Sequence, residues 1–575
     1  MRLNRVVGIC VTCILTFSVM LSPFEGAVKA ESGEPVDIVS VEGGLVKGVG
    51  TDVDGVQLFK GIPFAGSTAG ENRWKEPQPV EPWEGVKLAD TWGDQSMQDV
   101  TINPVGTFWG DEFYFDDSFS PDASENGLNL NVYTPANTVN DNLPVLVWIH
   151  GGGNDHGHAS EMEFYASKLA EKEVIVVEVQ YRLSMFGFLA LSELSEESEH
   201  GVSGNYAILD LVKSLKWVNQ HIDGFGGNPE EVTIAGQSAG ARNVTQLLRT
   251  PLAEGLFNKA IIQSGTQGFM PIGFPSLAEK EAADKEMITE AFGKEMTLEE
   301  LRALPAEYFM NTKTADGSET LFNALNTRGT VLDGYVFTEE SIDLMKDGAL
   351  DGVDIMIGGT SDERTSLVSG PSTMSLEDFD QTMGETYGKS YVKSYKPSDP
   401  VEAYDLFLRS QSDMRFQRYM VSTLYAKVHN EDTNIYNYYF NHAPPGRNSE
   451  FYGSYHSSDL WYFFNSMRDV EGQREWTPAD YTMGDIMSSY YANFVKNGNP
   501  NGESLPKWDE VDSSPKGSFI RFFDGKAESV TETPYPLRDN LNRKLILDDE
   551  GISPADLKNN QNNSSGSFSP ARFQK

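Results

Sequence analysis

One short stretch constrains the fold of this chain more than any other. Residues 236–240 read GQSAG, after the β-branched run of residues 231–235 and before residues 241–248, which suit a helix. Glycine on both sides of Ser238 lets the backbone turn sharply and lets strand and helix approach closely. Strand, G-x-S-x-G and helix form the context of a nucleophile elbow, which exposes a serine hydroxyl above a sheet. The pentapeptide alone is also common in ordinary turns, so its flanks decide the interpretation.

The flanks favour the elbow. Residues 226–229 (GGNP) are a strong turn signal directly before the strand. The whole run of residues 225–240 (FGGNPEEVTIAGQSAG) resembles the signature of type-B carboxylesterases, the family that includes cholinesterases. Residues 58–65 (LFKGIPFA) resemble a segment near the start of the same family. The resemblance covers most of residues 38–540 and implies an α/β-hydrolase fold.

The rest of the chain alternates strands and helices. Continuous apolar runs at residues 144–149 and 174–179 predict buried central strands, and shorter runs predict strands at residues 259–263 and 355–357. Residues 206–221 have helical apolar spacing. The pattern independently predicts an α/β fold with a large, mostly parallel central sheet and helices on both faces.

The start of the chain has the features of a secretory signal peptide at residues 1–30. It has a positive beginning, an apolar stretch at residues 6–21 and small residues before a cleavage point near Ala30. A short membrane anchor is the alternative, although the apolar stretch is marginal for a span. Cys10 and Cys13 are the only cysteines, so the secreted chain would have no disulfide.

Four further segments follow from composition and periodicity. The hydrolase domain is predicted at residues 31–553 and a disordered polar tail at residues 554–575. Two insertions, at about residues 271–350 and 372–430, have helical periodicity. We expect both to lie over the carboxyl edge of the sheet, as a cap that shapes the approach to the elbow.

The chain is strongly acidic. Its formal net charge is −40, and removal of residues 1–30, with three basic residues and one acidic residue, leaves −42. Such a surface repels nucleic acid and anionic membranes. The expected partner is therefore a small-molecule ester, with no nucleic acid and no membrane for the mature chain.

A serine nucleophile needs a general base and a third group that orients the base. In α/β-hydrolases the serine comes first along the chain, then the acid, then the histidine. Three histidines follow Ser238, namely His429, His442 and His456, together with many acids. The residues alone leave the choice open.

The family resemblance implies a choice. Residues 453–464 (GSYHSSDLWYFF) resemble the family's G-x-x-H-x-x-E-L-x-Y-x-F block, which implies His456 as the base. Residues 358–364 (GGTSDER) resemble the segment that carries the triad acid. This implies Glu363, with its neighbour Asp362 as the rival.

The oxyanion hole, which stabilises the negative charge that develops during the reaction, is also implied by the resemblance. Residues 150–153 (HGGG) follow a predicted buried strand and match the family's donor loop, although a glycine run is also typical of a flexible turn. The resemblance implies the backbone N–H groups of Gly152, Gly153 and Ala239 as oxyanion donors.

Several residues near the predicted site depart from the family or have two interpretations. Gln237 stands where the family usually has Glu, which weakens the case for choline esters. Asn154 stands where an aromatic residue is usual, which predicts a more polar pocket rim. Ser264 matches a serine that supports the triad acid, or it is a strand-end turn residue.

Two other features concern cofactors and disulfide bonds. His150, His156 and His158 allow a metal site, but no second ligand cluster supports one, so no metal or cofactor is expected. The family's first disulfide is absent, since Ser96 and the SENG segment of residues 124–127 stand at its two ends. The aromatic-rich loop between them therefore has no predicted path.

The sequence thus predicts a secreted serine hydrolase that cleaves carboxylic esters through an acyl-enzyme, with Ser238, His456 and Glu363 as its triad. An amide or carbamate hydrolase, or a lipase, would use the same triad. A non-catalytic binding member of the fold is the third alternative, and the intact triad speaks against it.

Overall fold

The computed structural model describes residues 36–265, 268–430, 432–446, 448–468, 474–511, 517–553 and 555–557. The predicted signal peptide at residues 1–30 lies outside these residues and stays a prediction, as does disorder in most of the predicted tail at residues 554–575. Leu557 is buried in the core. Packing therefore continues at least three residues into the segment that the sequence assigned to the tail.

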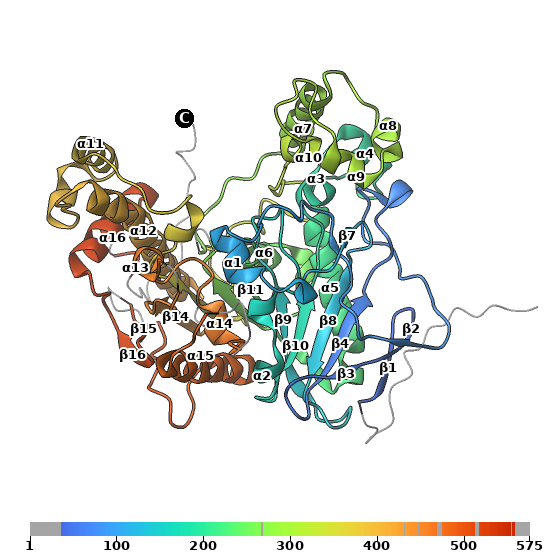
Figure 1. Cartoon of the computed structure of the whole chain (residues 1–575), viewed down its shortest axis with the longest axis horizontal. Coiled ribbons are helices and arrows are strands. Elements are labelled where there is room, and N and C mark those ends of the chain that lie inside the picture. Colours follow the sequence, from blue (N-terminus) through green and yellow to red (C-terminus); the bar gives the residue numbers. More distant parts are fainter. Residues whose placement is uncertain are drawn as a thin grey trace, which may run out of the picture.

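An eleven-stranded sheet forms the centre of the described chain (Figure 1). Its strands, in spatial order, are β16 (Lys526–Val530), β15 (Phe519–Phe523), β14 (Ile435–Phe440), β13 (Asp354–Thr360), β12 (Lys259–Gln263), β11 (Gly227–Gln237), β9 (Leu143–Ile149), β10 (Ile175–Val179), β8 (Asn129–Thr134), β4 (Gln57–Pro63) and β3 (Val49–Gly50). The pairs from β15 to β10 are parallel, and the pairs at both ends are antiparallel. The predicted α/β-hydrolase sheet is confirmed.

The central strands are buried on both faces. In β9, Val145, Val147 and Ile149 belong to one core cluster, while Leu146 and Trp148 belong to the other. The first cluster packs under α5 (Tyr206–His221), α6 (Ala239–Arg249), α12 (Pro400–His429) and α16 (Pro536–Glu550), and the second under α2 (Ser167–Ala170), α14 (Leu460–Phe463) and α15 (Pro478–Asn497). This two-sided burial explains why β9 and β10 are apolar without alternation.

The strand order creates a crevice at the carboxyl ends of two neighbours. The chain leaves β9 for β10 on one side and then returns to place β11 on the other side of β9. In open α/β sheets, ligands bind outside the carboxyl ends of strands at such a reversal. The HGGG loop follows β9 and the GQSAG turn follows β11, so both segments lie at this point.

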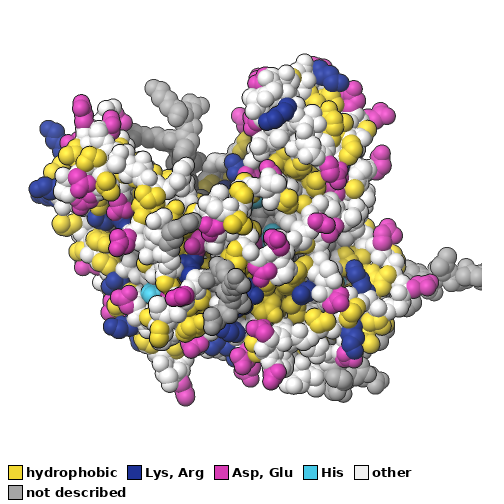
Figure 2. Space-filling model, in the orientation of Figure 1, with side chains coloured by type: hydrophobic (Ala, Val, Ile, Leu, Met, Phe, Trp, Pro, Cys, Tyr) yellow, Lys and Arg dark blue, Asp and Glu magenta, His cyan; other side chains and the backbone are white. Residues whose placement is uncertain are grey.

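The two insertions rise as separate lobes on opposite sides of the upper edge of the molecule (Figures 1 and 2). One holds α7 (Leu277–Phe292), α8 (Leu298–Ala303), α9 (Ala306–Asn311) and α10 (Leu321–Ala324), and the other holds α11 (Leu376–Tyr387) and α12. The second half of α12 differs from the prediction of a cap. Phe416, Met420 and Leu424 lie in the core cluster on the sheet face, because this half of the helix turns an apolar side toward β13 and β14.

The remaining elements lie around this framework. They are β1 (Ile38–Val41), β2 (Gly44–Lys47), β5 (Val86–Leu88), β6 (Gln95–Ser96), β7 (Ala123–Ser124), α1 (Phe108–Phe113), α3 (Ser184–Phe188), α4 (Ser192–Glu197) and α13 (Ser449–Tyr452). In the part of the chain that the structure describes, no helix combines the length and apolarity needed to cross a bilayer. Figure 2 shows acidic side chains spread over the visible face rather than gathered in one patch.

Contacts other than a disulfide close the loop between β6 and β7. Ser96 pairs with Ser124 in the β6–β7 ladder. Gly127 approaches so closely that a Cβ there would lie 2.6 Å from the Cα of Ser96. The two ends of the missing family disulfide thus remain in contact, and glycine permits a tighter approach than a cysteine pair would.

Candidate active site

Ser238 stands on a strained turn between β11 and α6. Its φ of 55° and ψ of −116° are unfavourable for a residue with a side chain. The turn is possible because a Cβ on Gly236 would lie 2.5 Å from Gly240, and a Cβ on Gly240 would lie 2.0 Å from the carbonyl oxygen of Ile149. Both glycines are therefore required for packing, and the half-buried Ser238 is held at the carboxyl end of the sheet.

The predicted base and acid meet at the ends of other elements. Glu363 follows β13, and His456 lies in the loop between α13 and α14. Nδ1 of His456 is hydrogen-bonded to Oε2 of Glu363. Because an ionised carboxylate only accepts hydrogen bonds, Nδ1 carries the proton, and in the neutral ring Nε2 keeps its lone pair.

Two further groups act on the Glu363 carboxylate. Nη1 of Arg415, on α12, lies 3.1 Å from Oε2 of Glu363. Burial would raise the pKa of Glu363, but the charge and hydrogen bond of His456, together with the charge of Arg415, lower it to about 2. The Ser264 hydroxyl adds a smaller lowering effect on this pKa, although its oxygen lies outside regular hydrogen-bond geometry. Glu363 is therefore an ionised carboxylate at neutral pH.

The rival residues have other partners. Asp362 accepts a hydrogen bond of 2.9 Å from the backbone N–H of Ser454 and pairs with Arg409, so it holds the loop that carries His456. His442 pairs with Asp480 of α15 at 2.7 Å. His429, at the end of α12, pairs with Asp347. In the described chain, no hydrogen bond or ion pair joins the side chain of any of these three residues to the side chains of Glu363 and His456.

Gln237 occupies the other nitrogen of the imidazole. Its side-chain nitrogen lies 3.3 Å from Nε2 of His456, and the residue is 3% exposed. In the described chain the Ser238 hydroxyl forms no hydrogen bond with His456. Catalytic hydrogen bonds are often long in structures without substrate and tighten in the complex. The side-chain nitrogen of Gln237 therefore lies where the lone pair of His456 Nε2 points, next to the GQSAG turn.

The HGGG loop lies beside the nucleophile. A Cβ on Gly151 would lie 3.3 Å from the Cβ of Ser238. Gly152 and Gly153 both have positive φ, and no hydrogen bond between described residues uses their backbone N–H groups. Ala239 is the first residue of α6, so its N–H has no partner within the helix. Three backbone donors are thus available next to Ser238.

Residues just after this loop are structural. Asn154, predicted at the pocket rim, is 4% exposed and accepts a hydrogen bond of 2.9 Å from Asn243 of α6, so its side chain braces the loop from within. His150 and His158 are buried, and desolvation lowers the pKa of each to about 3. His156 pairs with Asp155 at 2.6 Å.

These three histidines do not share a ligand set. Nδ1 of His150 faces the carbonyl oxygen of Gly151 at 3.0 Å, and Nδ1 of His158 faces Ser160 at 3.0 Å. Among the residues that the structure describes, no group of three or more histidine, cysteine or acidic side chains is arranged to hold a metal ion.

The aromatic loop, whose path the sequence left open, packs against the segment that carries His456. The ring of Phe108 lies 4.1 Å from that of Tyr452 and 5.0 Å from that of Tyr455, between centroids. Glu112 pairs with Arg474 and accepts a hydrogen bond of 2.8 Å from the Tyr455 hydroxyl. Ring contacts and an ion pair therefore anchor this loop.

A cavity of about 1110 Å³ lies between this loop and the segments next to the acid and the base. Its wall includes Phe108 and Trp109 from the loop, Ser366 and Ser369 after Glu363, and Tyr452 before His456. Its wall includes none of Ser238, Glu363 and His456.

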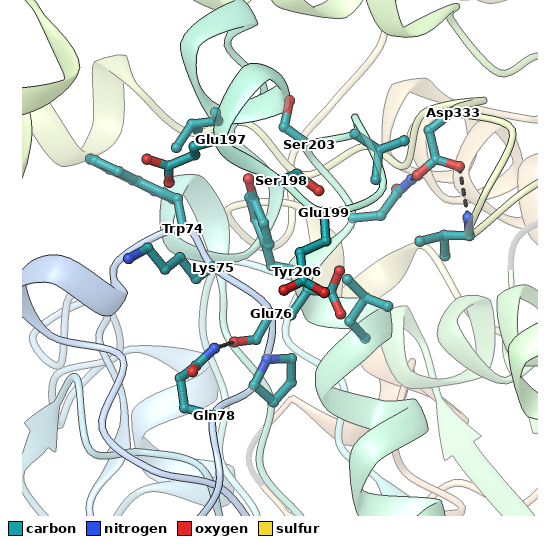
Figure 3. A pocket seen from close by; sticks show the side chains of 16 residues that line it. Trp74, Lys75, Glu76, Gln78, Glu197, Ser198, Glu199, Ser203, Tyr206 and Asp333 are labelled. Atoms are coloured by element: carbon teal, nitrogen blue, oxygen red, sulfur yellow. Dashed lines mark hydrogen bonds between the residues drawn. The ribbon is translucent and has the colours of Figure 1, made fainter.

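A separate cavity of about 410 Å³ lies between residues 74–78, α4 and the start of α5 (Figure 3). Glu76, Glu197, Glu199 and Asp333 make its wall acidic. None of the residues that we predict to be catalytic lines it, so this cavity is distinct from the candidate site.

The comparisons with known proteins concern the family of the chain. The model of the "Carboxylesterase family" matches residues 35–533. The chain belongs to the carboxylesterase family. The enzyme is therefore a carboxylic ester hydrolase, and its substrates are small-molecule esters.

Three relatives show how far the likeness extends. The enzyme is 33% identical to para-nitrobenzyl esterase of Bacillus subtilis over 482 residues, which is 81% of this chain and 91% of that one. It is 34% identical to fumonisin B1 esterase of Sphingopyxis macrogoltabida over 352 residues, 61% of this chain and 60% of that one. A solved carboxylesterase of Geobacillus stearothermophilus superposes with a TM-score of 0.70 at 27% identity and covers 88% of this chain and 99% of that one.

One residue that acts on the acid was not predicted. Arg415 lies on α12, 52 residues after Glu363, and no motif marks it. Only the packing of α12 on the sheet brings its guanidinium to the carboxylate. The signal that was available is indirect: an arginine within an apolar helix that packs on the sheet needs an acid nearby.

Proposed function

We propose that this carboxylesterase works through an acyl-enzyme on Ser238, with His456 as general base and acid and Glu363 as the orienting carboxylate. The observation that supports this most is the hydrogen bond between His456 and Glu363 beside the GQSAG turn. It joins two residues 93 positions apart that the family motifs name independently.

In the proposed first step, the Ser238 oxygen attacks the ester carbonyl carbon while Nε2 of His456 takes the hydroxyl proton. The oxyanion of the tetrahedral intermediate accepts hydrogen bonds from the N–H groups of Gly152, Gly153 and Ala239. The intermediate then expels the alcohol, which takes its proton from His456 and leaves the acyl group on Ser238. Water repeats the sequence, with His456 as base again, and releases the acid.

Gln237 has a defined place in this proposal. Its amide sits at Nε2 of His456 in the structure, so the Ser238 hydroxyl must displace it, or share that lone pair, when substrate binds. A neutral amide adds no charge beside the imidazole, whereas the usual glutamate would. This favours esters without a cationic alcohol part, and it argues against choline esters.

The first test compares Ser238→Ala with Ser214→Ala on p-nitrophenyl acetate. Ser214 is a buried serine in α5, away from the triad, whose hydroxyl bonds to the carbonyl of Leu211. We expect Ser238→Ala to lose roughly 10⁴-fold or more in kcat, since removal of a serine nucleophile leaves only binding and the oxyanion donors. Ser214→Ala should keep most activity, and full turnover by Ser238→Ala would rule out the proposal.

The amide, carbamate and long-chain ester alternatives use the same residues. Parallel kcat/KM values on short esters, long esters and anilides separate them. We expect short esters to be preferred, and a preference for anilides or long acyl chains would move the assignment to an amidase or a lipase. The absence of reaction with an organophosphate probe would instead favour a binding protein.

A further inference from the structure

A cavity with an unusual charge lies behind the acid of the candidate triad. It has a volume of about 350 Å³ and lies between α11, the middle of α12 and Arg364. Three of its wall residues are arginines, namely Arg364, Arg415 and Arg418, and none of the described wall residues is acidic. We call this cavity the arginine pocket. In a chain with a net charge of −40, such a pocket is a local reversal of sign.

The described chain neutralises only part of the positive charge of these arginines. Arg415 shares the carboxylate of Glu363 with His456. In the described chain, neither Arg364 nor Arg418 has an acid within 4 Å, and Nε of Arg364 is buried without a hydrogen-bond partner. Burial lowers the pKa of Arg364, and the positive charge of Arg415 lowers it further. Three guanidinium groups therefore face two carboxylates. One is Glu363, which already serves the base, and the other is Glu550, where the charge of Arg418 opposes the rise in pKa that burial causes.

The rest of the wall suits a compact ligand with polar edges. Met383 and Met414 are apolar wall residues, while Ser410 and Tyr387 are wall residues with hydroxyl groups, which donate to the carbonyl oxygen of Phe407 and to Oδ1 of Asn542. Guanidinium groups match the planar, two-oxygen geometry of carboxylates and phosphates. The volume exceeds that of a single water by about tenfold, so a small oxyanion and its hydration shell fit.

We propose that the arginine pocket binds a compact oxyanion with two or more negative charges, of the phosphate or dicarboxylate kind. Binding joins the oxygens of the anion to Arg364, Arg415 and Arg418 by charge-assisted hydrogen bonds. It balances the remaining positive charge, and it gives the buried Nε of Arg364 a hydrogen-bond acceptor.

The pocket is coupled to the candidate triad through Arg415. This step rests on the proposed function, whereas the binding does not. An anion that draws on Arg415 reduces the positive charge felt by the Glu363–His456 pair. The imidazolium then forms more readily, so the ascending limb of kcat/KM moves to higher pH when the pocket is filled.

Several charged or titratable groups surround the Glu363–His456 pair. The charged groups around Glu363 are His456, Arg415 and Arg364, and the titratable Tyr419, Tyr438 and Asp459 lie within electrostatic range of it. Burial raises the pKa of Tyr419 well above its usual value, so this hydroxyl stays neutral. Burial also raises the pKa of Asp459, to about 7, so its titration overlaps the limb and must be measured separately with Asp459→Asn.

The test is a titration of the full chain with inorganic phosphate and with malonate, by calorimetry and thermal unfolding, against chloride at matched ionic strength. We expect saturable binding of both anions, with stabilisation that chloride does not produce. Arg418→Met should weaken binding at least tenfold while leaving anion-free turnover of p-nitrophenyl acetate within about twofold. Arg521→Met, an arginine of β15 outside the pocket, is the matched control and should bind as the parent does.

Two results would overturn the anion site, and a third would overturn its coupling to the triad. One is no binding beyond that of chloride, and another is equal binding by the parent and Arg418→Met, which would mean non-specific ion association. The third, binding without a shift of the pH limb, overturns the coupling alone. Binding is also measured in Ser238→Ala, where it should persist, so loss of the catalytic proposal and loss of the anion site are distinguishable.

Discussion

The two halves of the candidate site are held in place by different means. On one side, the Ser238 turn and the HGGG loop are positioned by glycine backbones that touch at distances no side chain would permit. On the other side, Glu363 and His456 lie in loops and are held by ion pairs, with Arg409 on Asp362 and Arg415 on Glu363. Both of these arginines belong to α12, which comes from an insertion.

This difference in support predicts how each half of the site responds to substitution. Close backbone packing leaves no room for adjustment, so an added methyl group displaces the loop and the loss is steep. Charged pairs respond gradually, since a lost partner changes the protonation equilibrium rather than the backbone position. We therefore expect steric damage on the serine side and altered pH dependence on the histidine side.

The largest effect should come from Gly152→Ala. A Cβ there would lie 2.0 Å from the carbonyl oxygen of His156, so the loop must move and its donors leave the oxyanion position. Loss of one oxyanion donor typically lowers kcat by about 10²–10³-fold. Steady-state kinetics on p-nitrophenyl acetate measures it, with KM expected to change by only a few fold.

Gly255→Ala is the matched control for that change. Gly255 has a φ of 75°, close to the 85° of Gly152, but a Cβ there meets nothing within 4 Å. Both variants therefore carry similar backbone strain, and only Gly152→Ala adds a collision. Equal kinetic losses in the two variants would show that strain, not the position of the oxyanion donors, accounts for the result.

An intermediate effect should come from Arg415→Met. Without the guanidinium, less positive charge opposes protonation of the imidazole, so the ascending limb of kcat/KM moves to higher pH. Activity well below the limb should fall about tenfold, and the plateau at high pH should stay within a few fold. The measurement is a pH–rate profile of kcat/KM from pH 5 to 9.

Arg409→Met tests whether this shift is specific to Arg415. Arg409 lies on the same helix, but it pairs with Asp362 and Asp405 and, unlike Arg415, forms no ion pair with Glu363 in the described chain. We expect its removal to loosen the loop and lower activity without moving the limb. If the ascending limb of kcat/KM moved equally in both variants, Arg409 and Arg415 would not differ as a structural and an electrostatic residue.

The smallest effect concerns stability. Burial raises the pKa of Asp459 to about 7, so the folded state binds a proton that the unfolded chain releases near pH 4. Stability then falls as pH rises from about 4 to about 7. Asp459→Asn should remove this fall, with a gain on the order of 1–3 kcal/mol at pH 8 relative to pH 5, measured by urea unfolding.

Asp480→Asn gives the opposite case. Its pKa is lowered to about 2, because hydrogen bonds from His442, Thr477 and Tyr462 outweigh burial. The stability that Asp480 contributes is therefore fully present above pH 4. Asp480→Asn should destabilise the enzyme at both pH 5 and pH 8, measured by urea unfolding, and unchanged stability at both pH values would contradict this contribution.

The sheet and its nearest helix were predictable because their signals are local. The apolar run at residues 144–149 became β9, and residues 206–221 became α5 with the same bounds. The GQSAG turn was predicted from its two glycines, and the structure shows that a Cβ at either glycine would collide with neighbouring backbone atoms. Glu363 and His456 were named from motifs, and they lie in contact, while their roles remain a proposal.

The parts that escaped prediction depend on packing between distant segments. Arg415 and the sheet-facing half of α12 are defined only once α12 lies against β13 and β14. The aromatic loop is fixed by Glu112 and Arg474, which are 362 positions apart in the chain. Asn154 was assigned to the rim because its position in the motif was known, but the direction of its side chain depends on Asn243.

The most direct test of the central claim is to identify the acylated residue. The enzyme is treated with a fluorophosphonate probe, digested, and analysed by tandem mass spectrometry, with Ser238→Ala and His456→Gln alongside. The account predicts one stoichiometric adduct on Ser238 in the parent, none in Ser238→Ala, and labelling at least 100-fold slower in His456→Gln. An adduct on another residue, or unchanged labelling of Ser238→Ala, would contradict it.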